Sequence, residues 1–261
     1  MPQLSDLVLW LERIKKKFDT TCELMCESVL LSAVRREELV CLRVDTLPMD
    51  RREWLIANPE APLNEQTLSI TIKMGVKGSF YGMDNKDKIG PSRTILIPLT
   101  LALRWDEYRR TQRNKAFAKW TSGFTGSARI KRAKQAVHLF LREEDGKRFS
   151  GKDFYNVWTG VELPAPGWSP HKGRHWWACF VLWREIKKLK PFDNKIPNAI
   201  LEGSALSIIR MTIQPQLGHS LESTTMIYLK WVMNMLSVAV TLDADDEEDE
   251  NWGQAQGKAS A

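Results

Sequence analysis

Hydrophobic residues recur at helical spacing along most of the chain. Within residues 3–17 they lie three or four positions apart, at Leu4, Leu7, Val8, Leu11 and Ile14. This spacing places them on one face and predicts an amphipathic helix. Similar patterns predict helical segments over residues 20–34, 35–43, 99–120, 150–160, 171–188, 204–213 and 221–237. The chain is therefore expected to be mainly helical.

Two short segments have the pattern of β-strands instead. Residues 67–72 (TLSITI) and 93–97 (RTILI) alternate or are rich in β-branched residues. A long link containing four glycines joins them, and residues 46–66 before them are rich in Pro, Asn and Asp, which is typical of loops. We therefore expect an α+β fold: a mainly helical domain with a small antiparallel β-sheet on one side.

The composition is that of an ordinary globular protein. The chain has 261 residues, of which 43% are hydrophobic and 27% charged, which is enough for one large domain. No run approaches the ~20 apolar residues that cross a bilayer, and the N-terminus lacks the charge order of a signal peptide. The four cysteines are read as reduced, buried thiols. We expect an intracellular protein without membrane contact, placed in the cytoplasm or nucleoid if the host is prokaryotic.

The charge is unevenly distributed. The net charge is +6, from 38 bases and 32 acids, but residues 241–261 hold seven of the acids and one lysine. The remainder, residues 1–240, has 37 bases and 25 acids, or +12. We expect residues 1–240 to form one domain and residues 241–261 to be an acidic, disordered tail. A basic body suggests a polyanionic partner, although solubility alone would also account for the charge.

Bases are concentrated in one stretch of the domain. They are Arg104, Arg109, Arg110, Arg113, Lys115, Lys119, Arg129, Lys131, Arg132 and Lys134. Residues 121–134 (TSGFTGSARIKRAK) read as a glycine- and serine-containing loop within it. Because Trp120 and Phe124 are interleaved with the bases, a surface that contacts phosphates is at least as plausible as a solvated face.

Three short segments carry candidate chemistry. Residues 33–43 read AVRREELVCLR, residues 169–175 read SPHKGRH, and residues 217–228 read LGHSLESTTMIY. In the second segment His171 and Arg174 are three apart at a helix start, where both can face one side and where free N–H groups suit a phosphate oxygen. The third segment places His219 nine residues before Tyr228. His138, which lies outside these segments, is expected to be structural.

Together these segments resemble the tyrosine recombinase (phage integrase) family. The first is similar to the family's first arginine box, the second to its His-x-x-Arg-His box, and the third to its Leu-Gly-His box with the nucleophilic tyrosine. They occur in the family's order and cover roughly residues 20–230. The resemblance implies the DNA breaking–rejoining fold, with residues 1–240 as the catalytic domain.

The resemblance assigns the two active-site arginines to Arg35 and Arg174, which would hold the non-bridging oxygens of the scissile phosphate. Arg36 is a rival for Arg35, which is preferred because it precedes Glu38 by three. Glu38 would then be a structural partner of that arginine or of its helix. A planar guanidinium donates two hydrogen bonds and keeps its charge, which suits the pentavalent transition state.

The remaining roles follow from the same motifs. His171 would assist proton transfer around the tyrosine, and His219 would donate to a phosphate oxygen. Tyr228 would attack to form a 3′-phosphotyrosyl link and release a 5′-hydroxyl. The family's hairpin lysine, the general acid for that leaving oxygen, is assigned to Lys86, with Lys88 as the alternative. The chemistry implied needs no metal and no cofactor.

Some positions depart from the family pattern. Ala33-Val34 replaces the usual Gly-Leu, Gly173 stands where a leucine is common, and the link between the two strands is long. About 34 residues precede Arg35, too few for the family's core-binding or arm-binding domain. The chain therefore resembles a catalytic domain alone, either truncated or naturally short.

The resemblance implies a site-specific DNA recombinase or integrase that acts on paired sites of double-stranded DNA as a homotetramer. One alternative is a topoisomerase IB-like or telomere-resolving enzyme that uses the same pocket. Another is a non-catalytic DNA-binding remnant, although the intact set Arg35, His171, Arg174, His219 and Tyr228 favours an enzyme. The target sequence and the biological outcome, whether integration, excision or resolution, do not follow from the sequence.

Overall fold

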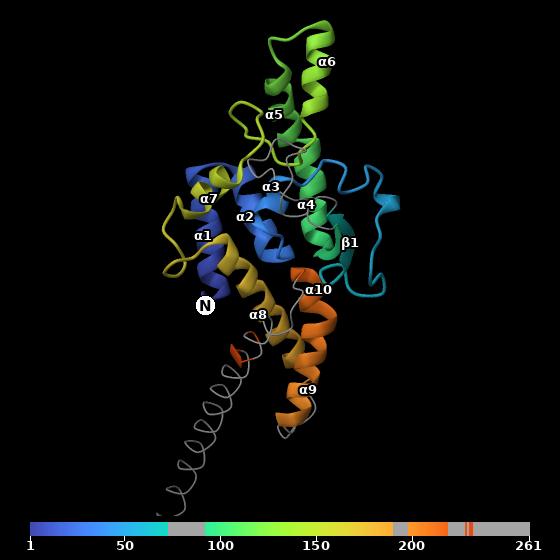
Figure 1. The fold of residues 1–261 in the computed structure, drawn as a ribbon, viewed down its shortest axis with the longest axis vertical. Coiled ribbons are helices and arrows are strands. Elements are labelled where there is room, and N and C mark those ends of the chain that lie inside the picture. Colours follow the sequence, from blue (N-terminus) through green and yellow to red (C-terminus); the bar gives the residue numbers. More distant parts are fainter. Residues whose placement is uncertain (73–91, 190–197, 219–227, 229, 232–261) are drawn as a thin grey trace, which may run out of the picture. The chain divides into compact units, whose positions relative to one another are not determined.

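The computed structural model describes residues 1–72, 92–189, 198–218, 228 and 230–231 (Figure 1). The chain divides into two compact units. The first unit contains Met1–Trp177 and Pro215–Gly218, and the second contains Ala178–Gln214 and His219–Ala261. The described residues are mainly helical and include a two-stranded antiparallel sheet, which confirms the expected α+β class. None of their helices is long and apolar enough to cross a membrane.

The first unit begins with two packed helices. Helix α1 spans Leu4–Lys17. In its first turn the carboxylate of Asp6 accepts a hydrogen bond from the Gln3 backbone N–H. Its buried residues are Leu7, Trp10 and Ile14, whereas Leu4 and Val8 are exposed, so the apolar face centres on Trp10. Helix α2 (Thr20–Ser32) is capped by Asp19 and buried on most of its sides, so it forms the centre of this unit's core.

The two predicted strands pair as expected. Strand β1 (Thr67–Ile72) lies antiparallel to β2 (Arg93–Pro98), with Ile70 opposite Ile95. Ile70, Ile72, Ile95 and Ile97 are buried, and β2 contacts α2 and α4. The link between the strands lies outside the described residues. One end of the sheet, at Arg93, faces the short helix α3 (Arg36–Val40) through side-chain contacts that are described below.

The basic stretch forms three helices. Helix α4 (Leu99–Arg110) is separated from α5 (Gln112–Thr121) by a non-helical Thr111, and α6 (Gly126–Gln135) lies beside α5 (Figure 1). The expectation of a loop over residues 121–134 is therefore wrong beyond Thr125. The segment SARIKRAK is rich in helix-forming Ala, Arg and Lys, which outweigh the glycines at its start.

The arginines of α4 differ from the bases that follow them. Arg109 and Arg110 bind the buried carboxylate of Asp106, and Arg104 binds Glu27 of α2. These three bases are therefore engaged in ion pairs within the protein. The expected phosphate-contacting surface is reduced to α5 and α6, where α6 has no buried residue.

Helices α7 to α10 follow along the chain. Helix α7 (Gly151–Thr159) is capped by Ser150, as predicted, because its Oγ accepts from the Asp153 N–H. Helix α8 (Pro170–Leu189) covers the predicted segment 171–188. The remaining elements are η1 (Arg51–Glu53), α9 (Asn198–Ile208), a π-helical turn η4 (Ile209–Ile213) and α10 (Gln214–Leu217).

Tryptophans account for much of the core near α8. Trp158 of α7 packs against Trp10 and Trp168, with ring centroids 4.6 and 5.8 Å away. A Cβ atom added to Gly173 would lie only 2.8 Å from Cη2 of Trp158. The start of α8 therefore approaches the tryptophan cluster too closely for a side chain at position 173, which accounts for the glycine there.

Candidate active site

Arg35 and Glu38 are fixed together at the start of α3. The Arg35 backbone N–H donates to Glu38 Oε2 at 2.7 Å, and its Nη1 donates to Glu38 Oε1 at 3.1 Å. The backbone contact is the N-terminal half of a capping box, which explains the three-residue spacing. Arg36, the rival candidate, instead pairs with Glu37 at 2.9 Å and is 44% exposed at its side chain. The geometry thus places Arg35, and not Arg36, beside Glu38.

Arg93 joins the same carboxylate, although no motif in the sequence pointed to it. From the first position of β2 it donates through Nε to Glu38 Oε1 at 3.1 Å and through Nη2 to Oε2 at 2.6 Å. Its Nη1 also donates to the Gln216 carbonyl. The available signal was an arginine at the first position of a mostly apolar strand, but this signal did not identify the partner of the arginine.

Arg174 reaches the site from the first turns of α8. Its Nη2 donates to the Leu217 carbonyl at 3.0 Å, and its Nη1 lies 3.9 Å from Glu38 Oε2. The side chain is 6% exposed, compared with 13% for Arg93 and 28% for Arg35. Of the three guanidiniums, that of Arg35 is therefore the most accessible to a bound ligand.

The Leu-Gly segment that follows α10 is held between these arginines. Gln216 donates through Nε2 to the carbonyls of Ser32 and Leu96, both at 2.8 Å, and accepts from the Leu96 N–H at 2.9 Å. Gly218 adopts a left-handed φ of 61°, and its carbonyl accepts from Arg35 Nη2 at 2.9 Å. A Cβ atom at this position would lie 3.3 Å from Arg35 Nη1. Glycine therefore permits both the turn and the close approach of Arg35.

The electrostatics of this arginine cluster, defined as Arg35, Arg93 and Arg174 around Glu38, favour an anion. Three cations share one carboxylate, which leaves a formal excess of two positive charges. Burial by itself would raise the pKa of Glu38. The hydrogen bonds and charge of Arg93, followed by those of Arg35, outweigh burial and lower the pKa below its ordinary value. Glu38 is thus ionised at neutral pH and orients the guanidiniums rather than exchanging a proton.

His171 lies one helical turn before Arg174 and is exposed. Its Nε2 is 2.7 Å from Nε2 of His175, so one of the two rings donates to the other. Burial, and after it the charge of Arg174, lowers the pKa of His171 below its ordinary value. A neutral imidazole can accept a proton, which is the role that the resemblance implies. The contact between His171 and His175 was not predicted, although their spacing of four residues on a helix allows it.

The structure gives no position relative to this cluster for the other predicted site residues. Tyr228 is helical, its side chain is 2% exposed, and it belongs to the second unit. Lys86, its alternative Lys88, and His219 lie outside the described residues, as does the acidic tail. Of the six predicted residues, the structure therefore places Arg35, His171 and Arg174 in the first unit.

Comparisons with known proteins do not identify a family. No protein-family model matches the chain, and no curated protein matches it significantly. Within the described residues, no group of three or more His, Cys, Asp or Glu side chains is arranged to hold a metal ion. The four cysteines are buried and not in disulfides.

Proposed function

We propose that the protein cleaves and rejoins DNA strands, with Tyr228 as the nucleophile, in the manner of the tyrosine recombinases that its motifs resemble. One observation carries the proposal. Arg35, Arg174 and the Leu217–Gly218 segment come from three motifs that are distant in sequence. They meet within hydrogen-bonding distance of one another around Glu38. Their meeting supports a shared role for the three motifs in binding one anionic group.

The chemistry follows from the residues. A scissile phosphate would bind near Arg35, whose guanidinium is the most exposed of the cluster, with Arg174 behind it. Their fixed charges stabilise the negative charge that builds on the non-bridging oxygens as phosphorus becomes pentavalent. Neutral His171 accepts the proton that the tyrosine hydroxyl loses. The Tyr228 oxygen bonds to phosphorus as the bond to the 5′-oxygen breaks, and Lys86 supplies the proton that this leaving oxygen takes. Reversal of these steps rejoins a strand.

DNA is also favoured as the partner by the charge of the α5–α6 helical pair. Residues 112–135 contain seven bases and no acid. Five of these bases are exposed and form no salt bridge among the described residues: Lys115, Lys119, Arg129, Lys131 and Lys134. Each cation that contacts a DNA phosphate releases a counterion, so the affinity should fall steeply with salt. This surface supports binding to a DNA backbone without sequence readout.

One observation favours a second reading. Tyr228 is buried, so attack on DNA requires that its hydroxyl leave this position when the substrate binds. A protein that binds DNA but never releases Tyr228 would be the non-catalytic remnant. The two readings differ in whether a covalent complex with DNA forms. Relaxation of a plasmid that carries no defined recombination site would instead indicate a topoisomerase-like enzyme.

Covalent capture tests the proposal. The protein is mixed with a pool of nicked duplexes of randomised sequence, from which the short 5′-hydroxyl fragment diffuses after cleavage, and is then denatured. We expect wild-type protein and the Tyr155→Phe control to retain DNA covalently, because Tyr155 is an exposed residue of α7. Tyr228→Phe should retain none while still binding DNA. Undiminished attachment in Tyr228→Phe would overturn the assignment, and salt-sensitive binding without attachment in the wild type would favour the remnant.

A further inference from the structure

Two imidazole rings meet near the start of α8. His171 and His175 are four residues apart, which brings their side chains together on one face of the helix. Their Nε2 atoms lie 2.7 Å apart, and the rings are perpendicular, with centroids 4.3 Å apart. His171 is exposed and His175 is half-buried, so the pair can be reached from solvent. Among the described residues, this is where two imidazole nitrogens converge.

The hydrogen bond between the rings accounts for their contact when no ligand is bound, because one Nε2 donates and the other accepts. The same two nitrogens are also the atoms through which histidine binds metal ions. Zinc proteases hold their metal through two histidines at this spacing, on one face of a helix. The pair therefore has the spacing and the convergence of half a zinc site.

A metal ion fits between the rings after a small movement. Zinc binds imidazole nitrogens at ~2.0–2.1 Å with tetrahedral angles, so two coordinated nitrogens are roughly 3.3 Å apart. The two Nε2 atoms, now 2.7 Å apart, would need to separate by roughly 0.6 Å, which rotation about the side-chain bonds supplies. Each ring would then carry its proton on Nδ1. The donor ring changes its tautomer, and no net proton is released.

The cations beside this histidine pair have contacts of their own. Arg174 Nη2 donates to the Leu217 carbonyl at 3.0 Å, and Lys172 Nζ donates to the Pro166 carbonyl at 3.1 Å. Their positive charges still oppose the binding of a metal ion. The pair also supplies only two ligands, which leaves the other coordination positions to water. We therefore expect a moderate affinity and a reversibly bound ion.

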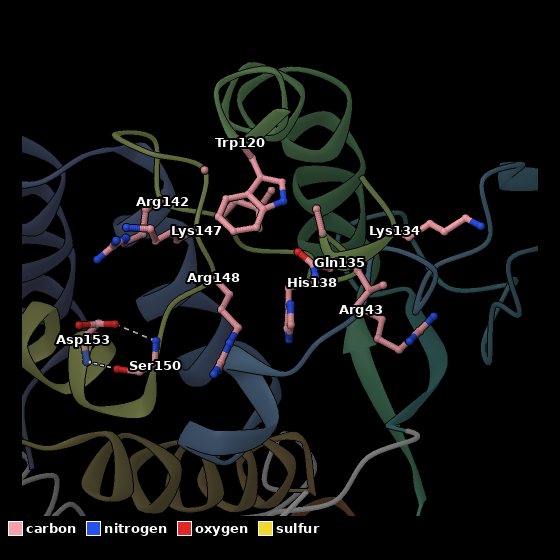
Figure 2. Close-up of a pocket in the computed structure, with 14 residues that line it drawn as sticks. Arg43, Trp120, Lys134, Gln135, His138, Arg142, Lys147, Arg148, Ser150 and Asp153 are labelled. Carbon is pink, nitrogen blue, oxygen red and sulfur yellow. Dashed lines mark hydrogen bonds between the residues drawn. The ribbon is translucent and has the colours of Figure 1, made fainter. Parts of the chain in front are cut away.

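His138, the third described histidine, lacks these features. Figure 2 shows it in a separate pocket, which is lined by the cations Arg43, Lys134, Arg142, Lys147 and Arg148. Its side chain is 3% exposed. Burial, and after it the charges of neighbouring arginines, lowers the pKa of His138 to about 4. One buried imidazole among cations does not favour a metal ion, so His138 is an internal control.

We propose that His171 and His175 bind a divalent transition-metal ion of the zinc type through their Nε2 atoms. Imidazole nitrogens favour Zn²⁺, Cu²⁺ and Ni²⁺, whereas Mg²⁺ and Ca²⁺ prefer oxygen ligands. The site depends on neither Tyr228 nor DNA, so it goes beyond the proposed function. A bound ion would also engage the ring that accepts the tyrosine proton and would thereby inhibit strand cleavage. That consequence, unlike the site itself, rests on the proposed function.

Calorimetric titration with zinc chloride tests the site at about pH 7.5, where an imidazole of ordinary pKa is mostly neutral. We expect the wild type to bind zinc. His171→Gln and His175→Gln should each raise the Kd at least about tenfold, because loss of a group that only supports a ligand already costs ~10–100-fold. His138→Gln removes a histidine outside the site, and Lys172→Gln removes a charge beside it. Both controls should still bind zinc, Lys172→Gln at least as tightly as the wild type.

No binding by the wild type at millimolar zinc would overturn the proposal. Equal affinity in the wild type, His171→Gln and His175→Gln would also overturn it and would assign the zinc to other groups, such as the acids of residues 241–261. Displacement of zinc by an equal concentration of magnesium would contradict coordination by imidazole.

The inhibition is tested by covalent capture of DNA. Zinc should lower capture by the wild type, a chelator should restore it, and His175→Gln should require at least about tenfold more zinc. Equal sensitivity to zinc in His175→Gln would overturn inhibition through this site. A wild type that captures no DNA in metal-free buffer would contradict the proposed function alone, because calorimetry tests the metal site without DNA.

Discussion

Arg93 donates to both carboxylate oxygens of Glu38, at 3.1 Å to Oε1 and 2.6 Å to Oε2. This ion pair joins the first residue of β2 to the first turn of α3. The Arg93 side chain is 13% exposed and the Glu38 side chain 1% exposed. Arg35 and Arg174 contact the same carboxylate. Glu38 is therefore the group that sets the positions of all three arginines.

Replacing Glu38 should be costly because three cations would lose their shared counter-charge. We expect Glu38→Gln to lower the free energy of unfolding by about 3 kcal/mol or more, the range for breaking a buried ion pair. Glu37→Gln is the control, since Glu37 pairs with the exposed Arg36 and should cost less than about 1 kcal/mol. Urea unfolding measures both. Similar losses in the two variants would contradict the central role of Glu38.

Gly218 should be required for the site as well as for the turn. Alanine in the left-handed region costs roughly 1–2 kcal/mol, and at position 218 its Cβ would also press on Arg35 Nη1. Gly123 has a similar φ of 75° but no atom within 4 Å of the added Cβ, so Gly123→Ala isolates the backbone strain. In urea unfolding Gly123→Ala should lose roughly 1–2 kcal/mol from the backbone strain, and Gly218→Ala should lose more because its Cβ is also crowded. Only Gly218→Ala should lower covalent DNA capture, and equal capture would contradict the contact.

Gly173 should be required by packing. In most helices Gly→Ala stabilises by up to about 1 kcal/mol, and Gly203→Ala in α9, where the Cβ would meet nothing within 4 Å, should do so. Gly173→Ala should instead destabilise by roughly 1–3 kcal/mol, because its Cβ would overlap the Trp158 ring held by Trp10 and Trp168. Chemical denaturation of both variants checks the opposite signs. If Gly173→Ala stabilised the protein, the tryptophan cluster would have to move to accommodate the Cβ atom, and the predicted clash would be contradicted.

His138 should make the protein less stable in mild acid. The unfolded imidazole binds a proton below about pH 6.5, whereas the folded one does so only near its pKa of about 4. The unfolded state therefore binds more protons between these values, and the free energy of unfolding should fall as the pH drops from about 6.5 to about 4. The fall is at most about 3 kcal/mol.

The His138→Gln variant tests that slope. Its free energy of unfolding should depend less on pH between 6.5 and 4.5, above the range where most carboxylates titrate. His171 also has a lowered pKa, so His171→Gln is measured in parallel and should remove a further part of the slope. An unchanged pH dependence in His138→Gln would contradict a buried, neutral His138.

Local patterns predicted most elements of the fold. Strand β1 has the predicted limits Thr67–Ile72, and α7 starts at the predicted Ser150 cap, because alternation and capping are properties of adjacent residues. The pairing of Arg35 with Glu38 was implied by the family resemblance, and the structure shows that the Glu38 carboxylate caps the Arg35 N–H three residues before it. Helix α6 was not predicted because the glycines and serines at its start are typical of loops, whereas the Ala, Arg and Lys residues after them favour a helix.

The missed parts of the site depend on distant residues. Arg93 meets Glu38 from a position 55 residues away, and no local pattern encodes that meeting. The need for Gly173 arises from Trp158 and the stack around it, which is a property of the packed core. The family resemblance assigned Arg174 to the site but did not predict its contact with the Leu217 carbonyl, which the structure shows at 3.0 Å.

The most direct test of the central claim is to identify the residue that becomes linked to DNA. Covalent complexes captured on nicked duplexes are digested with protease and nuclease, and the modified peptide is sequenced by mass spectrometry. We predict a nucleotide joined through its 3′-phosphate to Tyr228, with a 5′-hydroxyl on the released strand. A link at Tyr81, Tyr108 or Tyr155, a 5′-phosphotyrosyl bond, or no adduct on DNA that the protein binds would contradict the account.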